Sequence, residues 1–287
     1  MRNALLFFTV AACTLVASTV RADDPVDEVR PDDSADRHSI DRTWLYLDDA
    51  HVAAPMTAIG MSNATYTSVG SHPSQFGANT AQPGGLVSLG GEVGIVPRVS
   101  VMALGQMGFA GEGPGPSAGA TAGVRFQLLP PSMQRTHLVL SGGYVREAWA
   151  APVWNDSTSA WIPAQPHGDN GAWTQVAFSQ DIQRLRIGST VHAEHVFSPG
   201  RDPLDVMLQL GASYRVAGPF RAGVEYVGQD VEETLLAGAE GGARHFVGPT
   251  ASLQLLGDRL TMVAGPAVGL SAYSPAFVGR FALAYGF

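Results

Sequence analysis

The residues that could carry out catalysis are few and poorly placed for it. In His72-Pro73-Ser74 a histidine and a serine stand two residues apart, the spacing that puts two side chains on one face of a strand. Such a pair could cleave an ester if it came within hydrogen-bonding reach. Pro73 disfavours strand pairing, however, and the triplet falls in a predicted loop. A non-catalytic loop is the preferred interpretation, and lipid hydrolysis is the open alternative.

The other histidines do not form a recognisable site. His192 and His195 are three residues apart, so on a strand they face opposite sides and cannot chelate one metal ion together. His137 and Ser141 share a face but stand ~13 Å apart along a strand. The only cysteine, Cys13, lies near the start of the chain. The sequence therefore predicts no catalytic residue, no metal site and no cofactor.

Composition narrows the class of protein. The formal charge is −8 and lysine is absent, so a nucleic-acid partner is not expected. Charged residues make up 15% of the chain, against about 25% in ordinary soluble domains. Glycine accounts for 34 of 287 residues. No run beyond the N-terminal region approaches the ~20 apolar residues of a spanning helix.

The first 55 residues divide into two segments. Residues 1–22 combine Arg2, an apolar run and Val20-Arg21-Ala22, which indicates a signal peptide cleaved after Ala22. A membrane anchor, or lipidation of Cys13, are the alternatives. Residues 23–55 begin with an acidic stretch that has the composition of a disordered spacer. They end in a short apolar piece, 43–55, that could serve as a lead-in or a plug.

Residues 56–287 contain alternating segments at steady spacing, each long enough to cross a bilayer at a tilt. The twelve expected strands are 56–68, 84–96, 98–110, 117–128, 135–149, 171–182, 185–197, 203–216, 219–229, 244–256, 259–270 and 276–287. Short and long connections alternate between them, and the longest loop, 150–170, is flanked or occupied by Trp149, Trp154, Trp161 and Trp173. We interpret these tryptophans as an interfacial girdle, with a ligand-stacking surface as the alternative.

The final strand, "FVGRFALAYGF", places apolar side chains on one face and small or charged side chains on the other. No helical segment is available to cover twelve such apolar faces, whereas lipid can cover them all and barrel closure removes the edges. The chain thus resembles bacterial outer-membrane β-barrel proteins. The resemblance implies an all-β, antiparallel, up-and-down transmembrane barrel of twelve strands, with ten or fourteen as alternatives.

The resemblance also implies location and partners. We expect export to the outer membrane, contact with its lipid, and recognition of the last strand by the barrel-assembly machinery. The expected assembly signal is Phe281, Leu283, Tyr285 and Phe287. The function expected is a narrow diffusion channel for small solutes or ions, or a structural barrel. A lipid-active barrel enzyme of esterase or deacylase type is the alternative.

Charged residues on the opposite faces are expected to line the lumen: Glu92, Arg125, Glu147, Asp181, Arg186, Glu194, Asp205, Arg215, Arg221, Glu225 and Arg280. They either pair and fill the barrel or line a water-filled path. Counting from the tight turns, Asp181 and Arg186 should neutralise each other, and Arg215 should neighbour Arg221. Arg125 is expected to lack an acidic partner, which predicts a positive periplasmic ring and a weak anion preference. Glu147, Glu194 and Asp205 should make the outer mouth negative.

Overall fold

The structure is a computed structural model. It describes residues 50–67, 84–110, 117–129, 135–149, 153–155, 160–162, 167–197, 204–229, 231, 243–271, 274 and 276–287.

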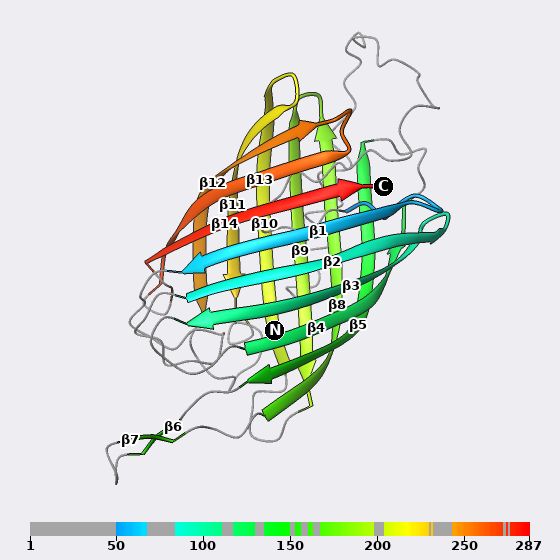
Figure 1. The fold of residues 1–287 in the computed structure, drawn as a ribbon. Coiled ribbons are helices and arrows are strands. Elements are labelled where there is room, and N and C mark those ends of the chain that lie inside the picture. Colours follow the sequence, from blue (N-terminus) through cyan, green and yellow to red (C-terminus); the bar gives the residue numbers. More distant parts are fainter. Residues whose placement is uncertain are drawn as a thin grey trace, which may run out of the picture.

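Twelve antiparallel strands form one closed barrel (Figure 1). They are β1 (Ala58–Thr67), β2 (Gly84–Val96), β3 (Val99–Ala110), β4 (Ser117–Gln127), β5 (Thr136–Trp149), β8 (His167–Ile182), β9 (Leu185–Val196), β10 (Leu204–Ala217), β11 (Phe220–Gln229), β12 (Arg244–Leu255), β13 (Leu260–Gly269) and β14 (Phe277–Gly286). Each strand pairs with its neighbours in the chain, and β1 pairs with β14 from Ile59↔Gly286 to Thr67↔Val278. The fold class and strand number predicted from the alternation are confirmed.

Two features of the strands differ from the prediction. β8 begins at His167 instead of residue 171, because it stays paired with β5 up to Trp149↔His167. The predicted loop 150–170 also contains two short strands, β6 (Val153–Asn155) and β7 (Ala160–Ile162), which pair only with each other. Each is three residues long, too short to give a recognisable alternation.

The two ends of the barrel are built differently. At one end, which we call the turn end, short turns join β2 to β3, β8 to β9, β10 to β11 and β12 to β13. The first residue of β1 and the C-terminus also lie at this end (Figure 1). The opposite end, the loop end, carries the β6–β7 hairpin, which projects away from the barrel in Figure 1.

Along each strand, side chains point alternately to the outer face of the barrel and to its interior. On β2, Leu89 is 69% exposed, whereas Glu92 is 1% exposed. The largest fully buried side chains are headed by Arg125, Glu92 and Glu225, while leucines, valines and phenylalanines dominate the exposed outer face. This arrangement is the reverse of a soluble protein, and it suits a barrel that is surrounded by lipid and polar inside. In the described residues, no helix is long and apolar enough to cross a membrane.

The interior is less uniformly polar than the sequence predicted. Near the loop end, Val227, Phe246, Ala267 and Val278 form a buried apolar cluster, with Met207 packed against it. These residues come from β10 to β14, and the register brings them together: Val227 pairs with Phe246, and Ala267 pairs with Val278. The loop half of the lumen is therefore filled partly by hydrophobic packing.

Candidate functional site: the turn end of the lumen

Glu92 organises the turn end of the lumen. Its Oε1 accepts hydrogen bonds from the Ser100 hydroxyl at 2.6 Å and from the Ala53 backbone N–H at 2.7 Å. Its Oε2 accepts a charge-assisted hydrogen bond from Arg125 Nη1 at 2.6 Å. Both charged side chains are at most 2% exposed. The carboxylate is thus bound to three partners, as a buried charge requires.

This ion pair corrects the expectation that Arg125 lacks an acidic partner. Glu92 is on β2 and Arg125 on β4, so the two residues are separated by strand β3. Ser100, which pairs with Arg125 across β3 and β4, lies between them. Adjacent-strand counting missed the contact because the pair reaches diagonally over an intervening strand.

Residues 50–57, which we call the strap, lie inside the turn end. The Ala53 N–H is bound to Glu92, and the ring centroids of His51 and His137, on β5, are 3.8 Å apart. Ala50 is fully buried and Ala53 is 3% exposed. The strap therefore contacts the interior of both β2 and β5. The rest of the predicted segment 23–55, and the signal peptide 1–22, lie outside the described residues.

At Gly94 the backbone of the strap lies directly against the backbone of β2. The Met56 N–H donates to the Gly94 carbonyl and the Gly94 N–H donates to the Thr57 carbonyl, both at 3.0 Å. A Cβ atom added to Gly94 would stand 1.9 Å from the Ala54 carbonyl oxygen. Any side chain at this position would therefore displace the strap.

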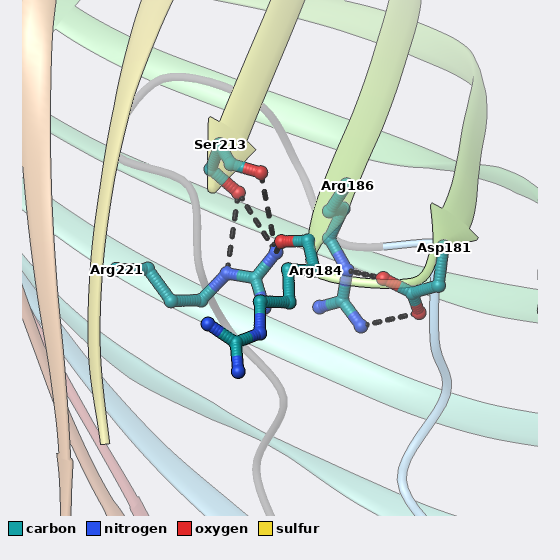
Figure 2. A network of polar contacts seen from close by, with 5 residues as sticks. All are labelled: Asp181, Arg184, Arg186, Ser213 and Arg221. Atoms are coloured by element: carbon teal, nitrogen blue, oxygen red, sulfur yellow. Dashed lines mark hydrogen bonds and ion pairs between the residues drawn. The ribbon is translucent and has the colours of Figure 1, made fainter. Parts of the chain in front are cut away.

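Asp181 and Arg186 form a second ion pair at this end. They face each other across the β8–β9 turn, and Arg186 Nε and Nη2 each donate to one carboxylate oxygen at 2.7 Å (Figure 2). The geometry is bidentate, the strongest form of an arginine–carboxylate contact. This pair agrees with the sequence prediction. The Arg186 side chain is 4% exposed and that of Asp181 is 25% exposed.

Arg215 and Arg221 are cross-strand neighbours, as predicted, but their environments differ. Arg221 is 3% exposed. Its Nε and Nη2 donate to the Ser213 hydroxyl at 3.3 Å, and Nη2 also reaches the carbonyls of Ser213 and Arg184 (Figure 2). Arg215 is exposed. The register of β10 and β11 shifts just beyond this pair, between Arg215 and Ala217.

Arginines in the turns themselves were not among the predicted site residues. Arg98, Arg135, Arg184 and Arg259 each directly precede a strand at the turn end, and all four are exposed. Together with Arg215 we call them the arginine ring. A signal was present in the sequence, since an arginine precedes β3, β5, β9 and β13. The prediction counted only residues within strands.

The other predicted lumen charges lie farther from the turns. Glu225 is 1% exposed on β11, and Arg280 is half-buried on β14. Asp205 on β10 and Glu194 on β9 are directly opposite each other in the strand register, toward the loop end. The side chain of Glu147 lies outside the described residues.

Trp173 belongs to the interior and not to an interfacial girdle. It is 6% exposed and stacks on His192, with ring centroids 5.7 Å apart. His192 Nδ1 is 3.2 Å from Gln175 Oε1, and its Nε2 is 3.9 Å from Glu194. β8 extends six residues before Trp173, and Trp173 lies on the same face of the strand as the buried Gln175, Ala177 and Ser179. The side chains of Trp149, Trp154 and Trp161 lie outside the described residues.

The candidate catalytic residues do not converge in the described part of the chain. His72, Pro73 and Ser74 lie outside the described residues. His195 is exposed and contacts Phe197, on the opposite face from His192. No group of three or more His, Cys, Asp or Glu side chains in the described ranges could hold a metal ion.

The predicted assembly residues share the outer face of β14. Phe281 is 38% exposed, and Tyr285 contacts Phe287 edge to face. The Phe287 N–H donates to the Ala58 carbonyl at 2.9 Å, so the last residue still belongs to the β1–β14 seam. Recognition of this strand by an assembly machinery stays a prediction.

No family model matches the sequence, and no curated protein matches it significantly. Solved structures do match. An outer-membrane channel from Pseudomonas putida F1 has a TM-score of 0.52 at 12% identity, over 83% of this chain and 98% of the other. The toluene transporter TbuX of Ralstonia pickettii gives 0.48 at 8% identity, over 81% and 89%. The β domain of the Bordetella autotransporter BrkA gives 0.47 at 11% identity, over 79% and 98%.

The first of these similarities covers nearly all of the other protein, and it agrees with the closed barrel, the exposed apolar belt and the polar interior described above. At 12% identity it concerns the fold alone. This chain therefore has the fold of the transmembrane β-barrels of bacterial outer membranes.

Proposed function

We propose that this protein resides in the bacterial outer membrane, with its turn end in the periplasm, and acts as a narrow channel without enzymatic activity. The observation that carries the proposal is the strap. It is held inside the turn end by the Glu92–Ala53 hydrogen bond and by backbone contacts to Gly94. On this proposal the strap obstructs the mouth at the turn end, and conduction requires it to move.

The strap is attached by few contacts compared with the strands around it. The hydrogen bond to the Glu92 carboxylate contributes about 1.5–3 kcal/mol and each backbone hydrogen bond to Gly94 about 1 kcal/mol, so releasing the strap costs less than opening a strand ladder. The buried wall residues, by contrast, are fixed by the register of the sheet. A small movable element inside a rigid wall is what a gated channel needs.

The arginine ring favours anions as the conducted ions. Within the lumen, Arg125 and Arg186 are neutralised by Glu92 and Asp181. The arginines at the rim are exposed to the mouth. The exposed arginines therefore add positive potential at the mouth to that of the buried Arg221, which donates to the neutral groups of Ser213 and the Arg184 carbonyl. The contribution of the exposed arginines should be reduced by salt.

A structural barrel that does not conduct is the second candidate. Several inward side chains are as deeply buried as a soluble core, including Val139 and Ala177 at 0% and Thr190 at 1%. Such burial indicates close packing across part of the lumen. A barrel filled in this way would have no continuous water path.

Single-channel recording of the refolded full chain in planar bilayers separates these candidates. Gly94→Ala should raise the open probability, because its Cβ would clash with the Ala54 carbonyl. Gly105→Ala is the matched control, since its Cβ would be 3.8 Å from the nearest atom, an ordinary contact. Reversal potentials in a salt gradient should show anion preference, reduced by Arg98→Gln with Arg259→Gln. Cation preference would refute the selectivity, and silence of both glycine variants would favour the structural barrel.

Two further parts of the proposal have their own tests. Absence of enzymatic activity predicts that the refolded chain releases no fatty acid from phospholipid vesicles, and that Ser74→Ala changes nothing. Recognition by the barrel-assembly machinery predicts that deletion of Phe287 lowers the amount of heat-modifiable, folded protein in the outer-membrane fraction. Equal amounts with and without Phe287 would contradict that role.

A further inference from the structure

The outer face of the barrel carries almost no formal charge. Among the strand residues with a described side chain, all arginines, aspartates and glutamates but one occupy positions of lumen parity. They are Glu92, Arg125, Asp181, Arg186, Glu194, Asp205, Arg215, Arg221, Glu225, Arg244 and Arg280. The exception is Arg146 on β5, which is exposed and directly follows the buried, inward Val145. Arg146 is therefore the one formal charge on the outer face of the described strand residues.

Arg146 lies toward the loop end, beyond the apolar part of the wall. On β5 and β8, the outward side chains nearer the turn end include Leu140 and Val176, which are 38% and 43% exposed. Tyr144, Arg146 and Asn170 follow them toward the loop end. A charge that faces lipid is costly at the bilayer midplane and is tolerated at the level of the headgroups. A cation in this position is therefore expected at headgroup level, in the leaflet at the loop end.

Polar side chains of neighbouring strands surround Arg146. Asn170 on β8 is directly opposite Arg146, and the Cβ atoms of such a pair are about 4.5–5.5 Å apart. The Tyr144 hydroxyl donates a hydrogen bond to Asn170 Oδ1. Tyr144 is opposite Ala172, which is in turn opposite the exposed His195 on β9. We call Tyr144, Arg146, Asn170 and His195 the outer polar patch.

The outer polar patch has the chemistry of a phosphate site. A guanidinium binds phosphate oxygens through two parallel hydrogen bonds, and an amide NH2 and an imidazole N–H are further donors. Arg146 forms no ion pair with any described side chain. Phe197, 55% exposed, adds apolar surface beside the patch, because its N–H donates to the Asn170 carbonyl at 2.8 Å. A ligand with an anionic head and apolar chains matches this combination.

A second polar pair on the outer face lacks the cation. Tyr226 on β11 and His245 on β12 also point outward near the loop end, and the Tyr226 hydroxyl is 2.8 Å from His245 Nδ1. Their rings are stacked with centroids 6.0 Å apart. Aromatic side chains with a polar tip are typical of the membrane boundary, so both pairs are expected at that level. The arginine distinguishes the outer polar patch from this second pair.

We propose that the outer polar patch binds the phosphate of a lipid headgroup and holds that lipid against β5, β8 and β9. Arg146 supplies the positive charge, and Asn170 and His195 supply neutral donors. The lipid belongs to the leaflet at the loop end, which is the external leaflet in the orientation proposed above. The site lies on the lipid-facing wall, so it depends neither on conduction nor on movement of the strap.

Quenching of a local fluorophore by brominated lipid tests this binding at the site itself. A bimane label is attached at Val176→Cys, on the same outward row of β8 as Ala172 and about 14 Å along the strand, in a full chain carrying Cys13→Ser. The chain is refolded in phosphatidylcholine vesicles that contain a small fraction of brominated phosphatidic acid or brominated phosphatidylcholine. We expect about tenfold preference for phosphatidic acid at this label. Inorganic phosphate should not displace the lipid, because it lacks the chains that pack against the wall.

Matched variants identify the residue responsible. Arg146→Gln should abolish the preference, Arg146→Lys should retain part of it because the charge remains, and His245→Gln should leave it intact. A label at Val224→Cys, on the outer face of β11 beside the second pair, should show no preference. Gel mobility of unheated samples verifies that each barrel is folded.

Three results would overturn the proposal, and the first two need no change at Arg146. They are equal quenching by the two lipids at Val176, the same preference at Val224 as at Val176, and a preference that survives Arg146→Gln. Displacement by inorganic phosphate would show a site for the free anion and would likewise contradict a lipid site.

Discussion

At the turn end the lumen contains paired charges, whereas near the loop end part of it is filled by a cluster of apolar side chains. Glu92 and Arg125 illustrate the first arrangement and Phe246 and Val227 the second, and all four are at most 7% exposed. Both halves are packed, but by forces with different requirements. Ion pairs depend on direction and complete partnering, whereas apolar packing depends on shape.

The difference shows which half can respond to its surroundings. The strength of the apolar contacts near the loop end does not depend on salt, because these side chains carry no charge. Only a rearrangement of the side chains would alter these contacts. The charged half includes the strap, whose contacts include a hydrogen bond to the Glu92 carboxylate, a backbone bridge to Gly94 and the ring contact between His51 and His137. A change at Glu92 therefore acts on both the wall and the mouth. The predictions below contrast the two halves, beginning with the largest expected effect.

Glu92→Gln should lower the free energy of unfolding by about 3–5 kcal/mol, because it removes the buried negative charge that is 2.6 Å from Arg125. Urea titration of the barrel in lipid vesicles, followed by tryptophan fluorescence, measures the change. A cost below about 1 kcal/mol would show that water reaches the ion pair and that the turn half of the lumen is solvated like a protein surface.

Leu283→Arg tests the face assignment on which the comparison depends. Leu283 lies on the outer face of β14, beside the inward Ala284, which is 4% exposed. An arginine at a lipid-facing position near the midplane should cost about 2–4 kcal/mol. The same urea titration in lipid vesicles measures the change. An unchanged stability would mean that Leu283 faces the lumen and that the assignment of the two faces of β14 is wrong.

Val227→Ala probes the apolar half. Val227 is 4% exposed and packs against Phe246, Ala267 and Val278. Loss of two methyl groups with a residual cavity should cost about 2 kcal/mol. The cost should be the same at low and high salt. A cost that varies with salt would show that the cluster is hydrated and that the halves differ less than described.

Glu194→Gln makes the same chemical change as the first variant, but toward the loop end. The Glu194 carboxylate is 3.9 Å from His192, and both side chains are about a quarter exposed. The loss should be no more than about 0.5 kcal/mol, and high salt should remove it. A loss as large as that of Glu92→Gln would erase the electrostatic contrast between the two ends.

Much of the barrel was predictable because its signals are local. Side-chain alternation has a fixed period of two, and the connections are marked by glycine, proline and paired polar residues. The strand predicted at 84–96 coincides with Gly84–Val96. The Asp181–Arg186 pair was predictable for the same reason, since a two-residue turn fixes its register.

The rest of the site depends on contacts between distant segments of the chain, which local sequence patterns do not reveal. Glu92 meets Arg125 across an intervening strand, so their contact depends on the stagger of three strands at once. The strap's position depends on Gly94 leaving room for its backbone. The ring arginines were visible beside the turns, but their arrangement around one mouth appears only when the barrel is closed.

The strap's contacts also bear on the order in which the barrel can assemble. Within the described residues, the strap contacts β2 at Glu92 and Gly94 and β5 at His137. The β1–β14 seam, in contrast, joins the two ends of the barrel sequence. Contacts between segments close in sequence form before distant ones because less chain entropy is lost. The strap can therefore be seated while the sheet is still open, so that the cylinder closes around a segment already in place.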